Sequence, residues 1–268
     1  MKHTNILSAL VLSFPLAACV TDEASEDQPE PELSSTTQAI TGTSVVTHQC
    51  DQPYGLPCFI DLGSTANNRA CFIGGISGRL DGGGVLIWND LGGNYQMMLA
   101  APSGTKIEAK TVCITGGTNR TTMTWTAGQP YDVVPATPNR HCFLQSISAV
   151  DDVAFNDTTD YIHTWKNGSN YYLGGQISGG ATPSATAVCI DTPYSTDVWG
   201  GVAVLGGTAG GNLVNNSSGG WACGFAKFGG KFTSSSYSDK LELGYNSSTA
   251  FWNWWLVNGK QAEAYCVK

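Results

Sequence analysis

The sequence has few charged residues, and its one long apolar segment is near the N-terminus. Charged residues make up 13% of the 268 residues, about half of the share usual in globular proteins. This scarcity, together with 33 glycines and 10% aromatic residues, excludes a coiled coil, a helical repeat array and a charge-rich disordered chain. No segment beyond the N-terminal region has a convincing helical period. The composition therefore predicts an all-β protein with many turns.

Several motifs that carry chemistry are also missing. The sequence has no Gly-x-Ser-x-Gly elbow, no Gly-rich phosphate loop, no Cys-x-x-Cys and no His-Glu-x-x-His. After the N-terminal region the only histidines are His48, His141 and His163, and we expect His141 and His163 to be surface residues rather than catalytic bases. We therefore expect a protein that is not an enzyme, with no catalytic residue, no cofactor and no metal site.

Four carboxylates lie close together in the sequence, and such groups have two known uses: loop carboxylates can bind Ca²⁺, and a carboxylate pair can hydrolyse glycosidic bonds. The group is Asp151, Asp152, Asp157 and Asp160. Its spacing is not that of a calcium loop, and the rest of the chain has no equivalent group. We expect these to be solvated acids of a turn.

The negative charge is concentrated in one segment. Residues 19–41 hold six acidic residues and no basic one, whereas residues 42–268 hold 12 basic and 15 acidic residues, a net charge of −3. Because the second segment has no basic stripe that could neutralise phosphates, we expect no nucleic-acid partner. Residues 19–41 have the character of an acidic, disordered tether.

The N-terminus carries an export signal. Lys2 and His3 precede the apolar run Ile6–Leu16, which is too short to span a bilayer, and the run ends in Leu16-Ala17-Ala18-Cys19. This ending resembles the lipobox of bacterial lipoproteins, which implies a signal peptide over residues 1–18 and a lipid on Cys19. The alternative is an ordinary signal peptide cut elsewhere. In Gram-negative lipoproteins a residue such as Val20 after the cysteine implies sorting to the outer membrane, so we expect a protein that is lipid-anchored there. The sequence does not distinguish the periplasmic face of that membrane from the surface-exposed face.

Eight cysteines remain after Cys19, an even number that is typical of disulfides in an exported chain. Six of them bracket three similar segments, which open with a cysteine followed by apolar and small residues and close with a cysteine after an alternating stretch. Matched positions predict the pairs Cys71–Cys113, Cys142–Cys189 and Cys223–Cys266, and Cys50–Cys58 would close a small loop.

These segments define a repeat of 71 to 81 residues, which indicates a repeat architecture or a closed pseudo-symmetric body. The repeats extend over about 42–117, 118–192 and 193–268. Each has about four antiparallel strands between its cysteines, in the first repeat Cys71–Leu80, Val85–Trp88, Tyr95–Ala100 and Lys106–Ile114. Three such sheets would resemble a β-prism, and the resemblance to threefold lectin-type folds is one of architecture only. The alternative is three small β-sandwich units in tandem.

Aromatic residues next to asparagines are the best candidates for a ligand site. Asn94-Tyr95 and Asn170-Tyr171 lie at matched positions, and the third repeat has Asn253-Trp254 within a run that adds Trp252 and Trp255. Aromatic faces can pack against the C–H surface of a sugar, while an Asn amide can bridge its hydroxyl groups. The same pattern is also expected if the aromatic residues are equivalent core residues. Both interpretations stay open here.

The sequence thus favours a surface-anchored binding or adhesion module, lectin-like, with a glycan or cell-surface polysaccharide as its partner. A structural envelope protein without a small ligand is the first alternative, and a polysaccharide-acting enzyme is the second. Three equivalent aromatic patches would favour the lectin, and a cleft with paired carboxylates would favour the enzyme.

Overall fold

The computed structural model describes most of the chain after the predicted tether. The described residues are 35–40, 43–52, 55–66, 69–116, 118–150, 152–192, 195, 199–202, 207–216 and 220–268. The predicted signal peptide, Cys19, most of the tether and Asp151 lie outside them. All the described residues belong to one unit, Pro31–Lys268. In these ranges no helix has the length and apolar character that crossing a bilayer requires.

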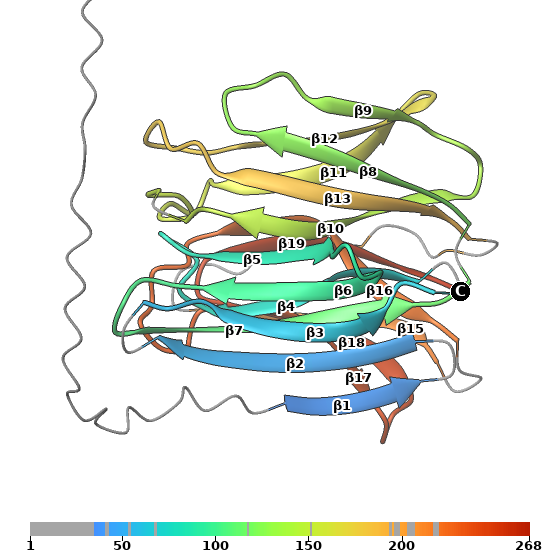
Figure 1. Cartoon of the computed structure of the whole chain (residues 1–268), viewed down its shortest axis with the longest axis horizontal. Helices are drawn as coiled ribbons and strands as arrows, with labels where there is room; N and C mark the ends of the chain where they lie inside the picture. Colours follow the sequence, from blue (N-terminus) through green and yellow to red (C-terminus); the bar gives the residue numbers. More distant parts are fainter. Residues whose placement is uncertain are drawn as a thin grey trace, which may run out of the picture. The chain divides into compact units, whose positions relative to one another are not determined.

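Every regular element of the described residues is a β-strand, as predicted, and the four strands expected in the first repeat coincide closely with β4 to β7 (Figure 1). The strands are β1 Ser35–Ile40, β2 Thr43–Gln52, β3 Cys58–Ser64, β4 Ala70–Gly78, β5 Gly84–Asn89, β6 Asn94–Ala100, β7 Thr105–Ile114, β8 Thr118–Thr126, β9 Asp132–Pro135, β10 Arg140–Ser148, β11 Tyr161–Asn167, β12 Asn170–Gln176, β13 Ser184–Asp191, β14 Trp199–Val202, β15 Thr208–Asn215, β16 Ala222–Gly230, β17 Lys240–Asn246, β18 Phe251–Val257 and β19 Lys260–Val267.

The first strand corrects the predicted extent of the disordered tether. Ser35–Ile40 lies within the segment 19–41, yet it forms β1 and pairs antiparallel with β2 over its whole length. Figure 1 shows the two blue strands side by side. The predicted disorder therefore does not hold for Ser35–Ile40.

The strands form three antiparallel sheets, and every sheet combines strands from two repeats. Sheet A has the order β1-β2-β7-β4-β17-β18-β15, sheet B β3-β6-β5-β10-β13-β8 and sheet C β14-β19-β16-β11-β12-β9. The predicted alternative of three separate sandwich units is wrong, because no sheet belongs to a single repeat. The expectation that the four strands between two cysteines form one sheet is also wrong. The first and last of them pair with each other, and the middle two join the neighbouring sheet.

The strands of each repeat are divided between two sheets, and the change of sheet occurs where the first strand after the opening cysteine ends. Gly78 and Gly230 have φ values of 93° and 104° there, a left-handed conformation that favours glycine. A Cβ atom on either residue would lie 2.2 Å from a backbone carbonyl oxygen. The chain therefore turns away from its own sheet at these glycines, and the next two strands pair elsewhere.

The three sheets are completed by equivalent contacts between repeats. The pairs are β4 with β17, β10 with β5, and β16 with β11. In each pair the residue seven positions after the first cysteine donates its N–H to the carbonyl just before the partner strand. These bonds join Gly78 to Asp239, Ala149 to Gly83 and Gly230 to Asp160, at 2.8, 2.7 and 2.7 Å. Each repeat thus contacts both of the others in the same way.

All four predicted disulfides are present: Cys50–Cys58, Cys71–Cys113, Cys142–Cys189 and Cys223–Cys266. The last three occupy the same position in their repeats, because each joins two residues that face each other on the paired strands. Each crosslink therefore holds the first and last bracketed strands of one repeat together.

The strands β4, β10 and β16 contact one another in the middle of the core. Nearly all their residues are buried, which explains their runs of apolar and small residues. Outer strands alternate instead, as in Thr105–Ile114, where Lys106, Glu108 and Lys110 lie on the less buried face. The outward side chains of such strands are the ones that can meet a ligand.

Candidate aromatic binding faces

Three strands of each repeat form a half-sheet whose outer face carries exposed aromatic surface. The half-sheets are β3-β6-β5 in sheet B, β9-β12-β11 in sheet C and β15-β18-β17 in sheet A. The pairing registers relate their positions to one another. For example, Trp88 faces Gln96, Trp165 faces Tyr172 and Gly244 faces Asn253.

The sheet B patch consists of Phe59, Leu86, Trp88 and Met98. Phe59 and Trp88 are 63% and 37% exposed, and their ring centroids lie 6.5 Å apart in an edge-to-face arrangement. Met98 pairs with Phe59 on one side and with Leu86 on the other, so the four side chains share one face. This face presents a continuous apolar surface.

The sheet C patch consists of Tyr131, His163, Trp165 and Tyr172. Tyr131 is 56% exposed and meets Trp165 edge to face, with centroids 5.0 Å apart. Trp165 also stacks on Tyr172 and lies against His163, at 5.5 Å from each. A Cβ atom on Gly174 would lie 2.2 Å from the Tyr131 ring, so glycine at this position lets the ring lie flat on the sheet.

The sheet A patch consists of Trp255, which is 42% exposed, and two glycines. Cβ atoms on Gly210 and Gly244 would lie 3.2 and 3.1 Å from the Trp255 indole. By register, Gly210 stands where Phe59 and Tyr131 stand, and Gly244 stands where Trp88 and Trp165 stand. One indole thus fills the place that two rings share in the other patches.

Charged groups surround two of the patches, and each positive group there has a partner. Beside Trp255, the Glu242 carboxylate lies 3.2 Å from Lys110 and 2.9 Å from Lys240. On sheet C, His163 Nε2 lies 3.1 Å from Glu263, and this hydrogen bond lowers the pKa of the Glu263 carboxyl. The Lys227 ammonium lies 4.4 Å from the centre of the Tyr161 ring. Paired charges of this kind are hydrogen-bonding groups with little net charge.

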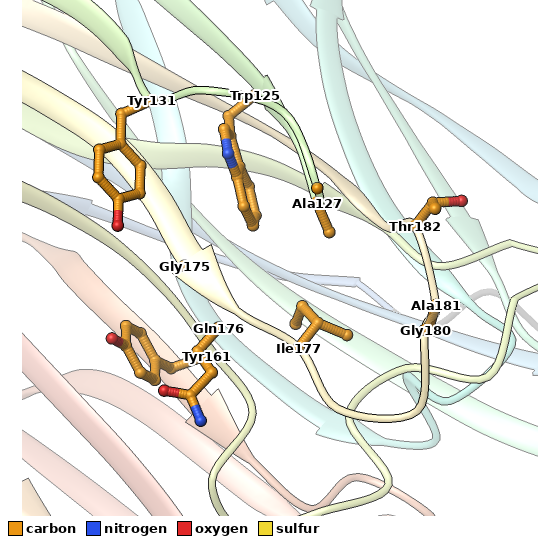
Figure 2. Close-up of a pocket in the computed structure, with 11 residues that line it drawn as sticks. Trp125, Ala127, Tyr131, Tyr161, Gly175, Gln176, Ile177, Gly180, Ala181 and Thr182 are labelled. Atoms are coloured by element: carbon orange, nitrogen blue, oxygen red, sulfur yellow. The ribbon is translucent and has the colours of Figure 1, made fainter.

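A cleft of about 460 Å³ adjoins the sheet C patch. Figure 2 shows Trp125 and Tyr131 next to each other along one wall, with Tyr161 and Gln176 across from them. The rest of the lining consists of Ala127, Gly128, Gly175, Ile177, Gly180, Ala181 and Thr182. Among the described residues, the side chains of Tyr131, Tyr161 and Gln176 have no hydrogen-bond partner. The cleft therefore offers aromatic faces and free polar groups together, which is the usual make-up of a small-molecule site.

Most of the aromatic residues singled out from the sequence are core residues. Tyr95, Tyr171, Trp252 and Trp254 are buried, as is Asn253, whereas Asn94 and Asn170 are half-buried. Of the candidates in this group, Trp255 alone has an exposed side chain. The core interpretation therefore describes the buried four, and only Trp255 belongs to a surface patch.

The structure also corrects the alignment of the third repeat. Trp252, and not Trp254, corresponds to Tyr95 and Tyr171, because each of these three side chains donates to the carbonyl two residues before the first bracketing cysteine. The bonds join Tyr95 to Arg69, Tyr171 to Arg140 and Trp252 to Trp221, at 3.0, 2.7 and 3.1 Å.

The described carboxylates of the acidic turn accept hydrogen bonds from neighbouring loop residues. Asp152 accepts hydrogen bonds from Thr182, Asp157 from Thr159, and the buried Asp160 from the Ser178 N–H. Within the described ranges, no group of three or more His, Cys, Asp or Glu residues is placed to hold a metal ion.

Sequence reasoning missed Phe59, Trp88, Tyr131 and Trp165. A usable signal was present for the two tryptophans, because Val85-Leu86-Ile87-Trp88 and Ile162-His163-Thr164-Trp165 have matching patterns on corresponding strands.

Comparisons of this chain with protein-family models, with curated proteins and with solved structures found no match.

Proposed function

We propose that this protein is a lectin-like module that binds carbohydrate through three aromatic patches. The observation that carries the proposal is the equivalence of these patches. Phe59 with Trp88 and Tyr131 with Trp165 lie at corresponding positions on the outer faces of their half-sheets. In sheet A the indole of Trp255, from the middle strand, covers the place that such a pair would occupy, because glycines stand at both equivalent positions. Four of these five side chains are at least 37% exposed, although large aromatic residues usually lie in cores and interfaces. An exposed ring can pack against the apolar face of a sugar.

The proposed architecture is a closed, pseudo-threefold, β-prism-like body. The cyclic exchange of strands between repeats supports this, since each repeat completes one sheet and opens the next. Three weak sites on one body would bind a repetitive polysaccharide more strongly than any single site, because the second and third contacts form at high effective concentration.

The proposed location is the surface of the outer membrane, with a lipid on Cys19 and a short acidic tether before β1. Four disulfides support an oxidising compartment outside the cytoplasm. A structural envelope protein is the main alternative function. Exposed aromatic surface on the outer face of each of the three equivalent half-sheets favours binding over a purely structural role, since such surface commonly marks an interaction site.

A glycan array with the purified protein tests the proposal. We expect binding to at least one polysaccharide, with clear loss in Trp88→Ala, Tyr131→Ala and Trp255→Ala and a larger loss in the triple variant. Val153→Ala is the control, because Val153 is also strongly exposed but lies outside the patches. Absence of glycan binding, or equal binding by a folded triple variant, would contradict the proposal.

A further inference from the structure

Sheet B has a groove next to its aromatic patch. Strand pairing between its halves extends over Val85 with Ile147 and Gly84 with Ser148, next to the Ala149 N–H bond to the Gly83 carbonyl. Beyond these pairs β5 and β10 separate, and the Ser146 hydroxyl bridges the gap by bonding the N–H and carbonyl of Ile87, at 2.7 and 3.0 Å.

Two adjacent hollows of about 220 and 210 Å³ open at this separation, and both are lined by Ile87, Trp88 and Thr186. Because these lining residues are shared, we treat the hollows as one groove, called the Trp88 groove. Arg120, Tyr95 and Gln145 line one end of it, and Ser148 and Ser184 line the other.

The Arg120 end of the groove carries a positive charge that no acid neutralises. The Nη1 atom of Arg120 donates to the Arg69 carbonyl oxygen at 3.1 Å and to the Tyr95 hydroxyl. Both partners are neutral, and within the described part of the chain no carboxylate pairs with Arg120. Arg79 and Arg140, in contrast, pair with Asp81 and Asp191. The guanidinium is thus held in place while its other N–H groups remain available, and a carboxylate matches the fork of such a group with two parallel hydrogen bonds.

Buried polar groups line the same end of the groove. The Thr186 hydroxyl oxygen is buried and has no hydrogen-bond partner among the described residues. Gln145 is also buried, and its amide nitrogen donates to the Cys71 carbonyl at 3.1 Å. Since an unsatisfied buried hydroxyl destabilises the free protein, a ligand hydroxyl that reaches Thr186 would remove this cost.

We propose that the Trp88 groove binds an acidic saccharide, with the sugar ring on Trp88, its carboxylate on Arg120 and a hydroxyl on Thr186. This inference rests on the proposed carbohydrate binding and names the class of sugar for one of the three faces. Charge supports the choice, because the positive groups beside the other two patches have carboxylate neighbours. Glu242 pairs with Lys110 and Lys240, and Glu263 interacts with His163 and Lys227. Sheet B would then select sugar acids while the other faces take neutral sugars.

Calorimetric titration of the purified full-length protein tests this inference. The probes are an oligogalacturonate, the same oligomer after reduction of its carboxyl groups, and a peptide with a free C-terminal carboxylate. We expect the acidic oligomer to bind more tightly than the reduced one and to lose affinity at high salt. Arg120→Gln should weaken its binding by roughly tenfold or more, as for loss of a charged hydrogen bond, and Arg120→Lys should weaken it less.

Lys166→Gln is the matched control, because it removes one exposed positive charge from another face. Thermal melting of each variant checks folding, and Thr186→Val provides a second probe of the groove. Equal affinity of the wild type and a folded Arg120→Gln variant for the acidic oligomer would overturn the inference. It would also be overturned if the peptide bound and neither oligomer did. If neutral glycans bind but the acidic oligomer does not, this inference fails alone, whereas absence of all glycan binding means that the proposed function fails as well.

Discussion

The rings of Phe72 and Phe143 stack with their centroids 4.4 Å apart, although they belong to different repeats. Each follows the first bracketing cysteine of its repeat, and Gly224 occupies that position in the third. Gly224 leaves the space that the two rings fill. The Tyr265 ring lies 4.8 Å from Phe143, and its hydroxyl accepts the Cys142 N–H at 2.6 Å. The three repeats therefore meet in an asymmetric core, to which the third repeat contributes Gly224 and Tyr265 where the others have phenylalanine and valine.

Substitution of Gly224 by alanine should destabilise the protein. A Cβ atom there would lie 2.3 Å from the Phe143 ring and 2.7 Å from the Phe72 ring, and both rings are fully buried. Such overpacking costs typically about 1–3 kcal/mol. Chemical denaturation of Gly224→Ala should show this loss. Gly92→Ala is the control, since its Cβ would meet nothing closer than the Asp90 carboxylate at 3.3 Å, and equal stability of the two variants would contradict the assigned packing.

Much of the local structure could be predicted from the sequence, because its signals are local. Cysteine spacing gave the disulfide pairs, and alternation with glycine-rich turns gave the strands of the first repeat. The exchange of strands between repeats could not be predicted in this way. It depends on pairs such as Leu241 with Ile76, which are far apart in the chain, and on the turn that Gly78 imposes.

The candidate site was predicted only in part, for a related reason. Asn94-Tyr95 suggested a match with Asn253-Trp254, but the core position is defined by a hydrogen bond to a carbonyl, which Trp252 makes. Of the predicted residues, Trp255 alone reaches a surface patch. Trp88 and Trp165 lie on the outward side of their strands, and only the pairing registers relate them to Trp255.

Loss of a long-loop disulfide should cost more than loss of the short one. Cys223–Cys266 separates its ends by 43 residues and Cys50–Cys58 by 8. In the chain-entropy model these loops contribute about 4 and about 2.5 kcal/mol. Urea unfolding of the two double Cys→Ala variants measures the difference. A larger loss for the Cys50 and Cys58 pair would show that local packing, not loop length, sets these contributions.

Acid should destabilise the protein below about pH 6.5, the ordinary pKa of histidine. Burial lowers the pKa of His48, and burial together with Lys166 lowers the pKa of His141 to about 4, against an opposing effect of Asp191. The unfolded chain therefore takes up protons between about pH 6.5 and 4 that the folded chain does not, so stability is complete above this range and falls as the pH decreases. The contribution of His141 is about 3 kcal/mol at most.

Thermal unfolding from pH 8 to pH 4 measures this dependence. His141→Ala should unfold with a weaker dependence on pH, and the variant should fold, because Ala70 and Ala222 stand at the corresponding positions of the other repeats. The same slope in wild type and variant would mean that His141 is protonated as easily in the folded state as in the unfolded chain.

The three tryptophans of β18 should separate into two classes. Trp252 and Trp254 are buried, and Trp255 is 42% exposed. Truncation of a buried tryptophan costs about 3–5 kcal/mol, because it removes apolar contacts and leaves a cavity, so Trp252→Ala and Trp254→Ala should melt early whatever the protein binds. Trp255→Ala should change stability by less than about 1 kcal/mol, as most surface substitutions do, because its indole contacts the sheet mainly over Gly210 and Gly244. The free energy of glycan binding should become less favourable by roughly 1–3 kcal/mol in this variant, by analogy with the loss of a ring on which a nucleic-acid base stacks. Thermal melting and glycan titration on the same three samples give both quantities. Early melting of Trp255→Ala would assign this ring to the core, and a stable variant with undiminished binding would remove sheet A from the set of binding faces.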